Sequence, residues 1–390
     1  MASQTPVRSD VIQLIQECYE QEKLSLPVPR RYGDIPISYD AITTVWLTAT
    51  LAPHTGGAVI KSFTLGPKDD GSSNRRRIQL EWEGTDTETS KLPASVFCKA
   101  AHALENRIIM SSAGTYSEVC FYNHVRPRLN IEAPTAYFAG YNPTSWASMI
   151  MLKDMGGAAV FCTHKTALTK VQAAEQIQIL AKLHGQNYRS KEPFFENLIG
   201  YKDRFDSLVL NLDLETVCDN GFKASKDVMP PRLFAREAEI WPATVKSVER
   251  NASLPQTVVH GDVHLGNWYI TDSGHMGLTD WQAMSKGHWS RDLAYVLGTG
   301  VPTDKRRLWE HELVQYYVDE LEKAGGPKTT VEEAWLELRR QTFGALWYWT
   351  ITLTPSKVMP DMQTKETTLD FIGRICALID DHDALDAFDI

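Results

Sequence analysis

Two carboxylates and one amide in a short stretch of the sequence have the chemistry of a site for a hard cation. Asp262, Asn267 and Asp280 all fall between His260 and Gln282. Carboxylate and amide oxygens are the ligands that Mg²⁺ prefers in proteins. A carboxylate in such a site can also accept the proton of an attacking group. The stretch therefore offers one candidate base, Asp262, and two candidate metal ligands.

The residues between Asn267 and Asp280 have the pattern of a β-hairpin. Apolar segments 268–271 and 276–279 flank a turn in which Gly274 tolerates positive φ. If the loop has two residues, Asn267 lies directly opposite Asp280. Directly opposed Cβ atoms are about 4.5–5.5 Å apart, which suits two ligands of one cation. A longer loop would shift this register.

The spacing of five positions from Asp262 to Asn267 is that of a kinase catalytic loop. There the Asp accepts the proton of the attacking hydroxyl and the Asn holds Mg²⁺. Phosphoryl transfer depends mainly on a positioned alcohol, a base and cations over the phosphate oxygens. The pattern therefore indicates phosphoryl transfer to a hydroxyl.

The chain resembles the aminoglycoside phosphotransferase and choline or ecdysteroid kinase-like family. The similarity lies in His260-Gly-Asp262-x-His264-x-x-Asn267, Asp280-Trp281-Gln282 and Arg291-Asp292-Leu293-Ala294-Tyr295. The resemblance implies a protein-kinase-like fold and ATP-dependent phosphorylation of small-molecule hydroxyls. It further implies that Asp262 is the catalytic base and that Asn267 and Asp280 bind Mg²⁺. The expected supports of the catalytic loop are His260, His264 and Asp292.

Weaker matches upstream follow the order of that family. Val96-Phe97-Cys98-Lys99 resembles the strand whose Lys reaches the α- and β-phosphates. A helix over 116–122 resembles the one whose Glu pairs with that Lys, here Glu118, with Glu105 as a competitor.

The nucleotide contacts are expected at two further places. The segment 149–155 resembles the hinge that binds adenine, and the candidate positions there are Met151, Lys153 and Met155. The segment 66–74 has no G-x-G-x-x-G, and the expected phosphate-covering turn is Gly71, Ser72 and Ser73.

A small-molecule acceptor is favoured over a peptide. Arg291-Asp292 follows Asp280 within a dozen residues, which leaves no room for an activation segment, and no A-P-E follows. Alternatives are a catalytically inactive nucleotide-binding scaffold (a pseudokinase) and a phosphotransferase whose acceptor is attached to a macromolecule. The identity of the acceptor and the choice between ATP and GTP stay open.

Two patterns have a competing interpretation. His260-x-Asp262-x-His264 also has the residue types of a transition-metal or metallophosphoesterase site. Trp281, Trp347 and Trp349 either line a substrate pocket or pack a core.

The elements expected around these residues form an α+β, bilobal, protein-kinase-like fold. Its N-lobe is a small antiparallel sheet and its larger C-lobe is mainly helical. Expected strands are 60–65, 77–82, 93–100 and 148–152, and expected helices are 11–21, 115–126, 166–186 and several within 305–387. The expected domains are a leader at 1–40, an N-lobe at 41–152, a hinge at 153–157 and a C-lobe at 158–390.

Composition narrows the class of protein. The chain has 390 residues, 43% of them hydrophobic, and a net charge of -9, which weighs against nucleic-acid binding. Its six cysteines form no C-x-x-C pair, which favours reduced thiols. No apolar run of about 18 residues occurs. We expect a cytoplasmic monomer or homodimer whose partners are ATP and a small-molecule hydroxyl acceptor, with no membrane or nucleic-acid partner.

Overall fold

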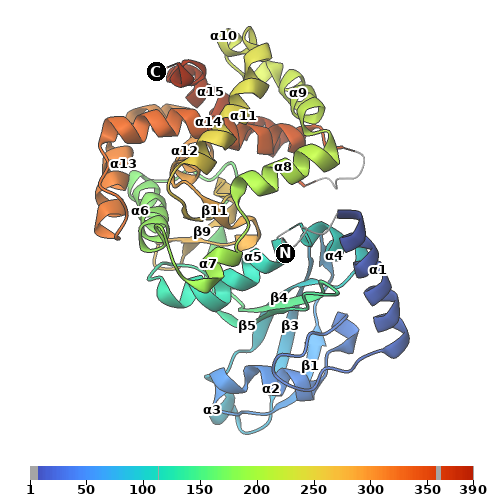
Figure 1. The fold of residues 1–390 in the computed structure, drawn as a ribbon. Coiled ribbons are helices and arrows are strands. Elements are labelled where there is room, and N and C mark those ends of the chain that lie inside the picture. Colours follow the sequence, from blue (N-terminus) through green and yellow to red (C-terminus); the bar gives the residue numbers. More distant parts are fainter. Residues whose placement is uncertain (1–7, 113, 357–361, 390) are drawn as a thin grey trace. The chain divides into compact units, whose positions relative to one another are not determined.

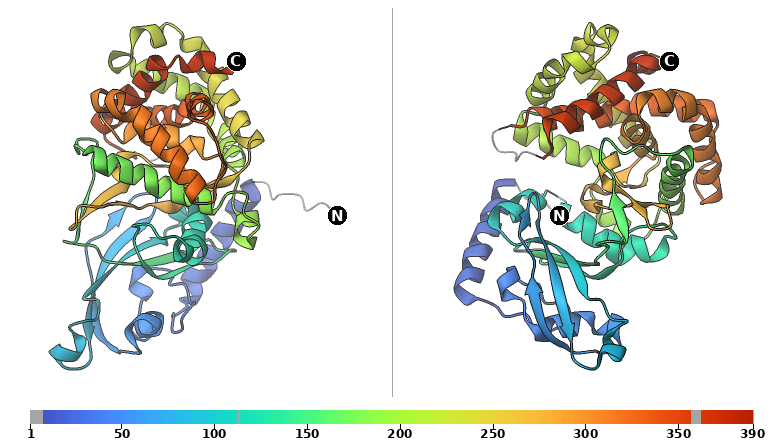
Figure 2. Two further views of the ribbon diagram at one scale, coloured as in Figure 1. Left: turned by 90° about the vertical axis from the view of Figure 1, so that its left-hand side faces the viewer. Right: turned by 180° about the vertical axis from the view of Figure 1, so that it is seen from behind.

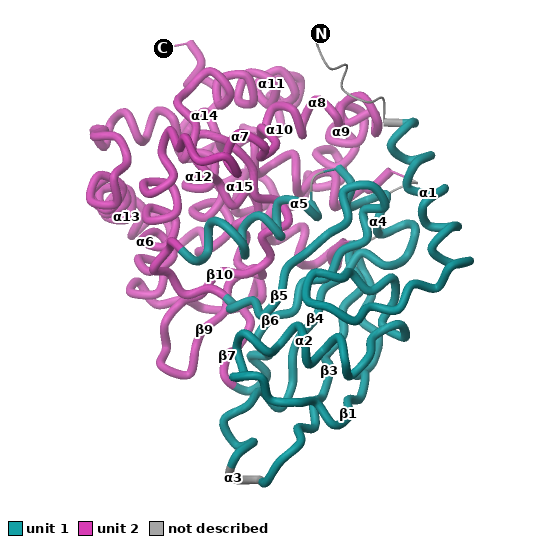
Figure 3. Tube along the Cα trace, turned by 60° about the horizontal axis from the view of Figure 1, so that its bottom comes forward, with its two compact units in different colours: residues 1–127, 134–157 teal, residues 128–133, 158–390 magenta. Residues whose placement is uncertain are grey.

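The computed structural model describes residues 8–112, 114–356 and 362–389, and the chain forms two compact units (Figures 1 and 3). Unit 1 contains Met1–Pro127 and Pro134–Gly157, and unit 2 contains Arg128–Ala133 and Ala158–Ile390. The predicted α+β class, with an antiparallel sheet and a largely helical region, is confirmed.

An antiparallel sheet forms the centre of unit 1. Its strand order is β1-β3-β4-β6-β5, and the short β2 pairs with β3. The strands are β1 (Ile60–Leu65), β2 (Asp69–Asp70), β3 (Asn74–Trp82), β4 (Ser95–Ala101), β5 (Ala136–Tyr141) and β6 (Ser148–Lys153). The four strands predicted in this region are therefore present, and the prediction missed β2 and β5.

The sheet packs against a helix that the sequence did not predict. Helix α2 (Thr44–Thr55) buries Trp46, Leu47 and Leu51 in one core with strand residues such as Ile78 and Val96. The Thr43 side chain caps its N-terminus, and Gly56 ends it with a φ of 65°. The expected helices include none over Thr44–Thr55, since the β-branched residues in 42–50 have strand propensity. Burial against the sheet outweighs that propensity.

The other helices described in unit 1 are α1 (Arg8–Ser25), α3 (Asp86–Thr89), α4 (Leu104–Met110) and α5 (Gly114–Cys120). The predicted helix 115–126 corresponds to α5 and the π-helical turn Phe121–Val125 that follows it.

Helices make up most of unit 2, with α14 (Val331–Leu353) at their centre (Figure 2). It packs against α9, α11, α12, α13 and α15. The other helices are α6 (Lys170–Gln186), α7 (Pro193–Asn197), α8 (Tyr201–Leu212), α9 (Leu214–Ala224), α10 (Pro231–Phe234), α11 (Glu237–Ser253), α12 (Ser290–Thr299), α13 (Thr303–Lys323) and α15 (Lys365–Asp381). The predicted helix 166–186 begins at Lys170, where Thr169 and Gln172 form a capping box.

Two small antiparallel sheets in unit 2 carry the segment singled out by the sequence. One has the order β10-β9-β7 and the other pairs β11 with β8. The strands are β7 (Ala159–Phe161), β8 (Thr257–Val259), β9 (Trp268–Thr271), β10 (Met276–Leu278) and β11 (Ser285–Gly287).

The register of the β9–β10 hairpin differs from the prediction. Ile270 pairs with Met276, and the Thr279 N–H donates to the Asn267 carbonyl at 2.9 Å. Thr279, rather than Asp280, therefore stands opposite Asn267. The reason is a longer loop, since Thr271 pairs with His275 through a 2.9 Å backbone bond and Gly274 takes a φ of 85°.

Two further features concern the cysteines and the character of the helices. All six cysteines are free, and five of them are buried. In the described part of the chain, no helix has both the length and the apolar character required to cross a membrane.

Candidate active site

The loop after β8 is held by a buried carboxylate of α12. The Asp292 side chain is fully buried and accepts the backbone N–H groups of His260 at 2.6 Å and of Gly261 at 3.0 Å. His184 on α6 lies 3.2 Å from the same carboxylate. Burial by itself would raise the pKa of Asp292, but His184 and Arg291 hold it below its ordinary value. Asp292 therefore stays charged and fixes the path of the loop.

A close approach at Gly261 restricts the same loop. Gly261 has a φ of 85°, and a Cβ there would lie 2.5 Å from the Ala283 carbonyl oxygen. Any other residue would collide with the segment that follows Asp280. The loop and the Asp280 segment are therefore packed backbone to backbone.

Asp262 follows this braced turn and is the half-buried carboxylate of the site. Its Oδ1 accepts a hydrogen bond from the Tyr295 hydroxyl at 2.8 Å. Its Oδ2 lies 3.3 Å from Asn267 Nδ2 and 3.7 Å from His264 Nε2. The carboxylate keeps 22% of its side-chain surface exposed, which leaves it able to meet a substrate.

The Asn267 amide has a defined orientation. Its Nδ2 donates to the Asp262 carbonyl at 2.7 Å, so Oδ1 is the amide atom turned away from the loop backbone. Asp280 has a φ of 62°, a left-handed conformation that is rare for residues other than glycine. This turn redirects the chain directly after the Asn267–Thr279 pair. The structure thus brings Asp262 and Asn267 into contact. Asp280 follows Thr279, the residue that stands opposite Asn267 in the hairpin.

His260 is a structural residue of the loop. Its Nδ1 accepts the Asp262 N–H at 3.2 Å, and its Nε2 donates to the Thr279 carbonyl at 3.0 Å. Burial lowers the pKa of His260, so the ring stays neutral. The Trp281 ring packs edge-on against it, with centroids 4.5 Å apart. With both ring nitrogens engaged by backbone, the transition-metal interpretation of His260-x-Asp262-x-His264 is wrong.

His264 has a similar local role. Its Nδ1 accepts the Gly266 N–H at 3.1 Å, and its ring packs edge-on against Trp349 at 5.2 Å. Trp281 and Trp349 are 0% and 3% exposed, so they pack the loop from inside. Their contact with a substrate stays a prediction.

Unit 1 brings the predicted lysine and glutamate together. Lys99 on β4 and Glu118 on α5 form an ion pair of 2.8 Å in which the Glu118 side chain is 2% exposed. Glu105, the competing partner, is exposed on α4.

The expected phosphate-covering turn is the tip between β2 and β3. The Gly71 N–H donates to the Ser73 carbonyl at 3.0 Å, and Asn106 Nδ2 donates to the Gly71 carbonyl at 2.7 Å. Ser73 is buried, whereas Gly71 is exposed and Ser72 is half-buried. Gly71 and Ser72 are therefore the accessible members of this turn.

The expected adenine hinge ends β6. Met151 lies in β6 between β4 and β5, so its backbone takes part in the sheet, and the Lys153 N–H donates to the Thr135 carbonyl at 2.8 Å. Met155 lies beyond the strand. Of the three predicted positions, it is the one outside the paired region.

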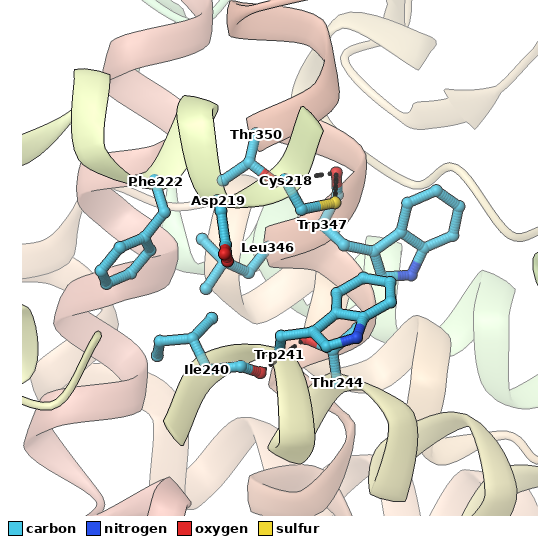
Figure 4. A pocket seen from close by; sticks show the side chains of 9 residues that line it. All are labelled: Cys218, Asp219, Phe222, Ile240, Trp241, Thr244, Leu346, Trp347 and Thr350. Carbon is cyan, nitrogen blue, oxygen red and sulfur yellow. Dashed lines mark hydrogen bonds between the residues drawn. The ribbon is translucent and has the colours of Figure 1, made fainter. Parts of the chain in front are cut away.

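Trp347 lines a pocket of unit 2 that contains no other predicted site residue. The pocket lies between α9, α11 and α14 (Figure 4). Its lining comprises Cys218, Asp219, Phe222, Ile240, Trp241, Thr244, Leu346, Trp347 and Thr350. The Trp347 Nε1–H points to the Tyr201 hydroxyl at 2.9 Å.

Sequence reasoning missed two supports of the loop. His184 lies on the buried face of the predicted helix 166–186. The apolar periodicity of that helix gave no reason to pair His184 with Asp292. Tyr295 stands inside the Arg291–Tyr295 motif, and its spacing of three from Asp292 on a helix was the available signal.

The described residues do not form a metal site built from protein side chains alone. Within the described ranges, no group of three or more His, Cys, Asp and Glu residues is arranged to hold a metal ion. Mg²⁺ commonly uses only one or two carboxylates together with substrate phosphates and water. The donor set of Asn267 Oδ1 and Asp280 fits that mode.

Comparison with known proteins gives a family match and several similar folds. Residues 137–332 match the model of the phosphotransferase enzyme family (APH). No curated protein matches the chain significantly in sequence.

The structural relatives have low sequence identity. A microcompartment-associated aminopropanol kinase is 12% identical with a TM-score of 0.50, over 84% of this chain and 94% of that one. A Ralstonia eutropha protein assigned to the aminoglycoside phosphotransferases is 13% identical with a TM-score of 0.50, over 87% and 97%. A spectinomycin phosphotransferase, in complex with ADP and spectinomycin, is 13% identical with a TM-score of 0.47, over 88% and 99%. At this level of identity the similarity concerns the fold.

Proposed function

The chain belongs to the phosphotransferase enzyme family, and from this premise we propose that it transfers the γ-phosphoryl group of ATP to a hydroxyl of a small molecule. The observation that carries the proposal is the half-buried Asp262 carboxylate, in contact with Asn267 on a loop that Asp292 braces. A carboxylate next to an amide oxygen supports the proposal, because phosphoryl transfer requires a base close to a metal ligand.

Asp262 is the proposed base. The acceptor hydroxyl oxygen forms a bond to the γ-phosphorus, while the bond between that phosphorus and the β-γ bridging oxygen breaks. The hydroxyl proton passes to Asp262, and ADP leaves with the electrons of the broken bond. Because the transition state is loose, the carboxylate mainly orients the hydroxyl and accepts its proton late.

Asn267 and Asp280 are the proposed Mg²⁺ ligands. The Asn267 amide supports this role because its Nδ2 is engaged with the Asp262 carbonyl, which leaves the hard oxygen Oδ1 for a cation. When bound, the ion neutralises charge on the phosphate oxygens.

Residues of unit 1 are proposed to bind the nucleotide. The 2.8 Å contact with Glu118 holds the Lys99 ammonium in a nearly buried position, from which it would bind phosphate oxygens. Gly71, Ser72 and Ser73 are proposed to cover the phosphates, and Met155 to offer its backbone to the base. Met151 and Lys153 stay weaker candidates because both belong to β6.

Substitution of the base tests the proposal directly. We expect Asp262→Asn to lower turnover by about 10²–10⁴-fold, the usual contribution of a general base, with ADP affinity retained. The measurement is phosphate transfer from Mg²⁺-ATP to kanamycin, 1-amino-2-propanol, a neutral hexose and a sterol, followed by mass spectrometry of the products.

Asp272→Asn provides the matched control, because Asp272 is an exposed carboxylate at the tip of the same hairpin. It should turn over like the unmodified protein. Equal rates for Asp262→Asn and Asp272→Asn would refute the assigned base. ADP binding without transfer to any acceptor would support the pseudokinase alternative instead.

A further inference from the structure

Helix α12 contacts three consecutive residues of the candidate catalytic loop through two side chains. Asp292 accepts the N–H groups of His260 and Gly261, and Tyr295 donates to the Asp262 carboxylate. Asp292 and Tyr295 are three positions apart, so they lie on the same face of the helix. One face of helix α12 therefore holds both the backbone of the loop and the side chain of Asp262.

We propose that Tyr295 is a positioning residue for the catalytic base. Its hydroxyl holds one carboxylate oxygen of Asp262, so that the other oxygen faces the acceptor hydroxyl. This inference rests on the proposed function of Asp262. It assigns a role in the transfer step to a tyrosine that does not itself touch the substrate.

The geometry divides the two carboxylate oxygens. Oδ1 takes the 2.8 Å hydrogen bond from the Tyr295 hydroxyl. Oδ2 has longer contacts, 3.3 Å from Asn267 Nδ2 and 3.7 Å from His264 Nε2. A hydrogen bond weakens steeply with distance and misalignment, so Oδ2 is the oxygen left to accept a further proton. Tyr295 thereby selects both the rotamer and the reactive atom.

Tyr295 is suited to this role because it stays fixed and protonated. The residue is 1% exposed, so neighbouring side chains hold its ring in one orientation, with the Tyr348 ring centroid 6.3 Å away. Burial, followed by the negative charge of Asp262, raises the pKa of Tyr295 well above its ordinary value. The phenol therefore remains a donor across the range in which the enzyme would be assayed.

The loss of this bond has a defined kinetic signature. In Tyr295→Phe the ring is retained, but the carboxylate gains a second rotamer. A hydrogen bond to a charged group is stronger than one between neutral groups, so kcat should fall by about 10- to 100-fold. KM for ATP should not change, because the variant leaves Lys99 and the metal ligands untouched. The fraction of ATP lost to water should rise, because a misaligned base orients the acceptor hydroxyl poorly.

Tyr269→Phe is a closely matched control. Tyr269 is also a buried tyrosine that donates to a carboxylate at 2.8 Å, in this case Glu132 in unit 2. Its removal should leave kcat unchanged, since Glu132 is exposed and has no proposed role in the reaction. A merely structural role of Tyr295 would move the two variants in parallel.

The experiment measures kcat, KM for ATP, the ratio of free phosphate to phosphorylated product and the urea unfolding of each variant. The acceptor is the member of the four-compound panel with the highest kcat/KM. A fall in kcat and a rise in that ratio for Tyr295→Phe, but not for Tyr269→Phe, are expected. Equal kcat in both variants and the unmodified protein would overturn the inference while leaving the proposed function intact. An unmodified protein that transfers to no acceptor would contradict the proposed function, and the inference with it.

Discussion

The two units secure their candidate site residues by different kinds of contact. In unit 1, Lys99 and Glu118 meet through an ion pair of 2.8 Å between two side chains. In unit 2, Asp292 bonds directly to the backbone of the loop that carries Asp262. A bond to backbone fixes the path of the chain, whereas an ion pair fixes only the ends of two flexible side chains.

This difference predicts different consequences of mutation. Removal of the Asp292 carboxylate should disturb the fold and the site together. The Lys99–Glu118 pair should be replaceable as a pair without loss of the fold, because two apolar side chains can fill the same space. We therefore expect stability and function to be separable in unit 1 and coupled in unit 2.

The largest effect on stability is expected for Asp292→Ala. The change leaves the N–H groups of His260 and Gly261 and the ring of His184 without their buried acceptor. Loss of one partner in a buried charged network costs about 3–5 kcal/mol. The measurement is urea unfolding followed by tryptophan fluorescence, together with turnover.

Asp227→Ala serves as its control, since Asp227 is exposed. A surface substitution of this kind should change the free energy of unfolding by less than about 0.5 kcal/mol. A similarly small change for Asp292→Ala would show that the loop holds its path without the carboxylate.

A smaller effect is expected for Lys99→Met. This variant leaves the Glu118 carboxylate buried without its ammonium partner and should cost about 3 kcal/mol. The double variant Lys99→Met/Glu118→Leu should regain most of that stability but bind ATP as weakly as the single variant. Urea unfolding and calorimetric titration with ATP measure the two quantities.

Lys61→Met is the matched substitution at an exposed position of β1 and should alter neither quantity. If the double variant were as unstable as Lys99→Met alone, the ion pair would be needed for the fold. The contrast between the units would then disappear.

The smallest expected effect is on the pH dependence of the free energy of unfolding, in which the two units should behave alike. Burial lowers the pKa of His102 in unit 1 and of His288 in unit 2 to about 3. Below pH 6.5 each histidine binds a proton in the unfolded chain but not in the folded one, so the free energy of unfolding falls as the pH falls. The loss is about 1.4 kcal/mol per pH unit for each group, from pH 6.5 down to about 3.

Unfolding of His102→Gln and His288→Gln at pH 7.0 and 5.5 tests this expectation. Each variant should lose about 1.4 kcal/mol less stability over this interval than the unmodified protein. A pH dependence unchanged in both variants would mean that other groups cause it. If the pH dependence of the free energy of unfolding decreased in only one variant, the two units would differ in their response to pH. The ion pairs would not explain that difference.

Much of the fold could be predicted because its signals are local. Strands 60–65 and 268–271 have the bounds given by their apolar pattern, and the helix 166–186 differs from α6 only at its start. Helix α2 was missed because its Thr- and Val-containing sequence has strand propensity, while burial of Trp46, Leu47 and Leu51 against the sheet decides the outcome.

The amino-acid sequence alone indicated the chemistry that we propose for the protein, because the residue types and spacing of Asp262, Asn267 and Asp280 are properties of one continuous segment. Tertiary structure decided how these groups are held. The three-residue hairpin loop set Thr279 opposite Asn267, and helix α12 brought Asp292 and Tyr295 to the loop from about thirty residues further along the chain. Contacts between distant segments depend on how whole elements pack, and no local pattern encodes that packing.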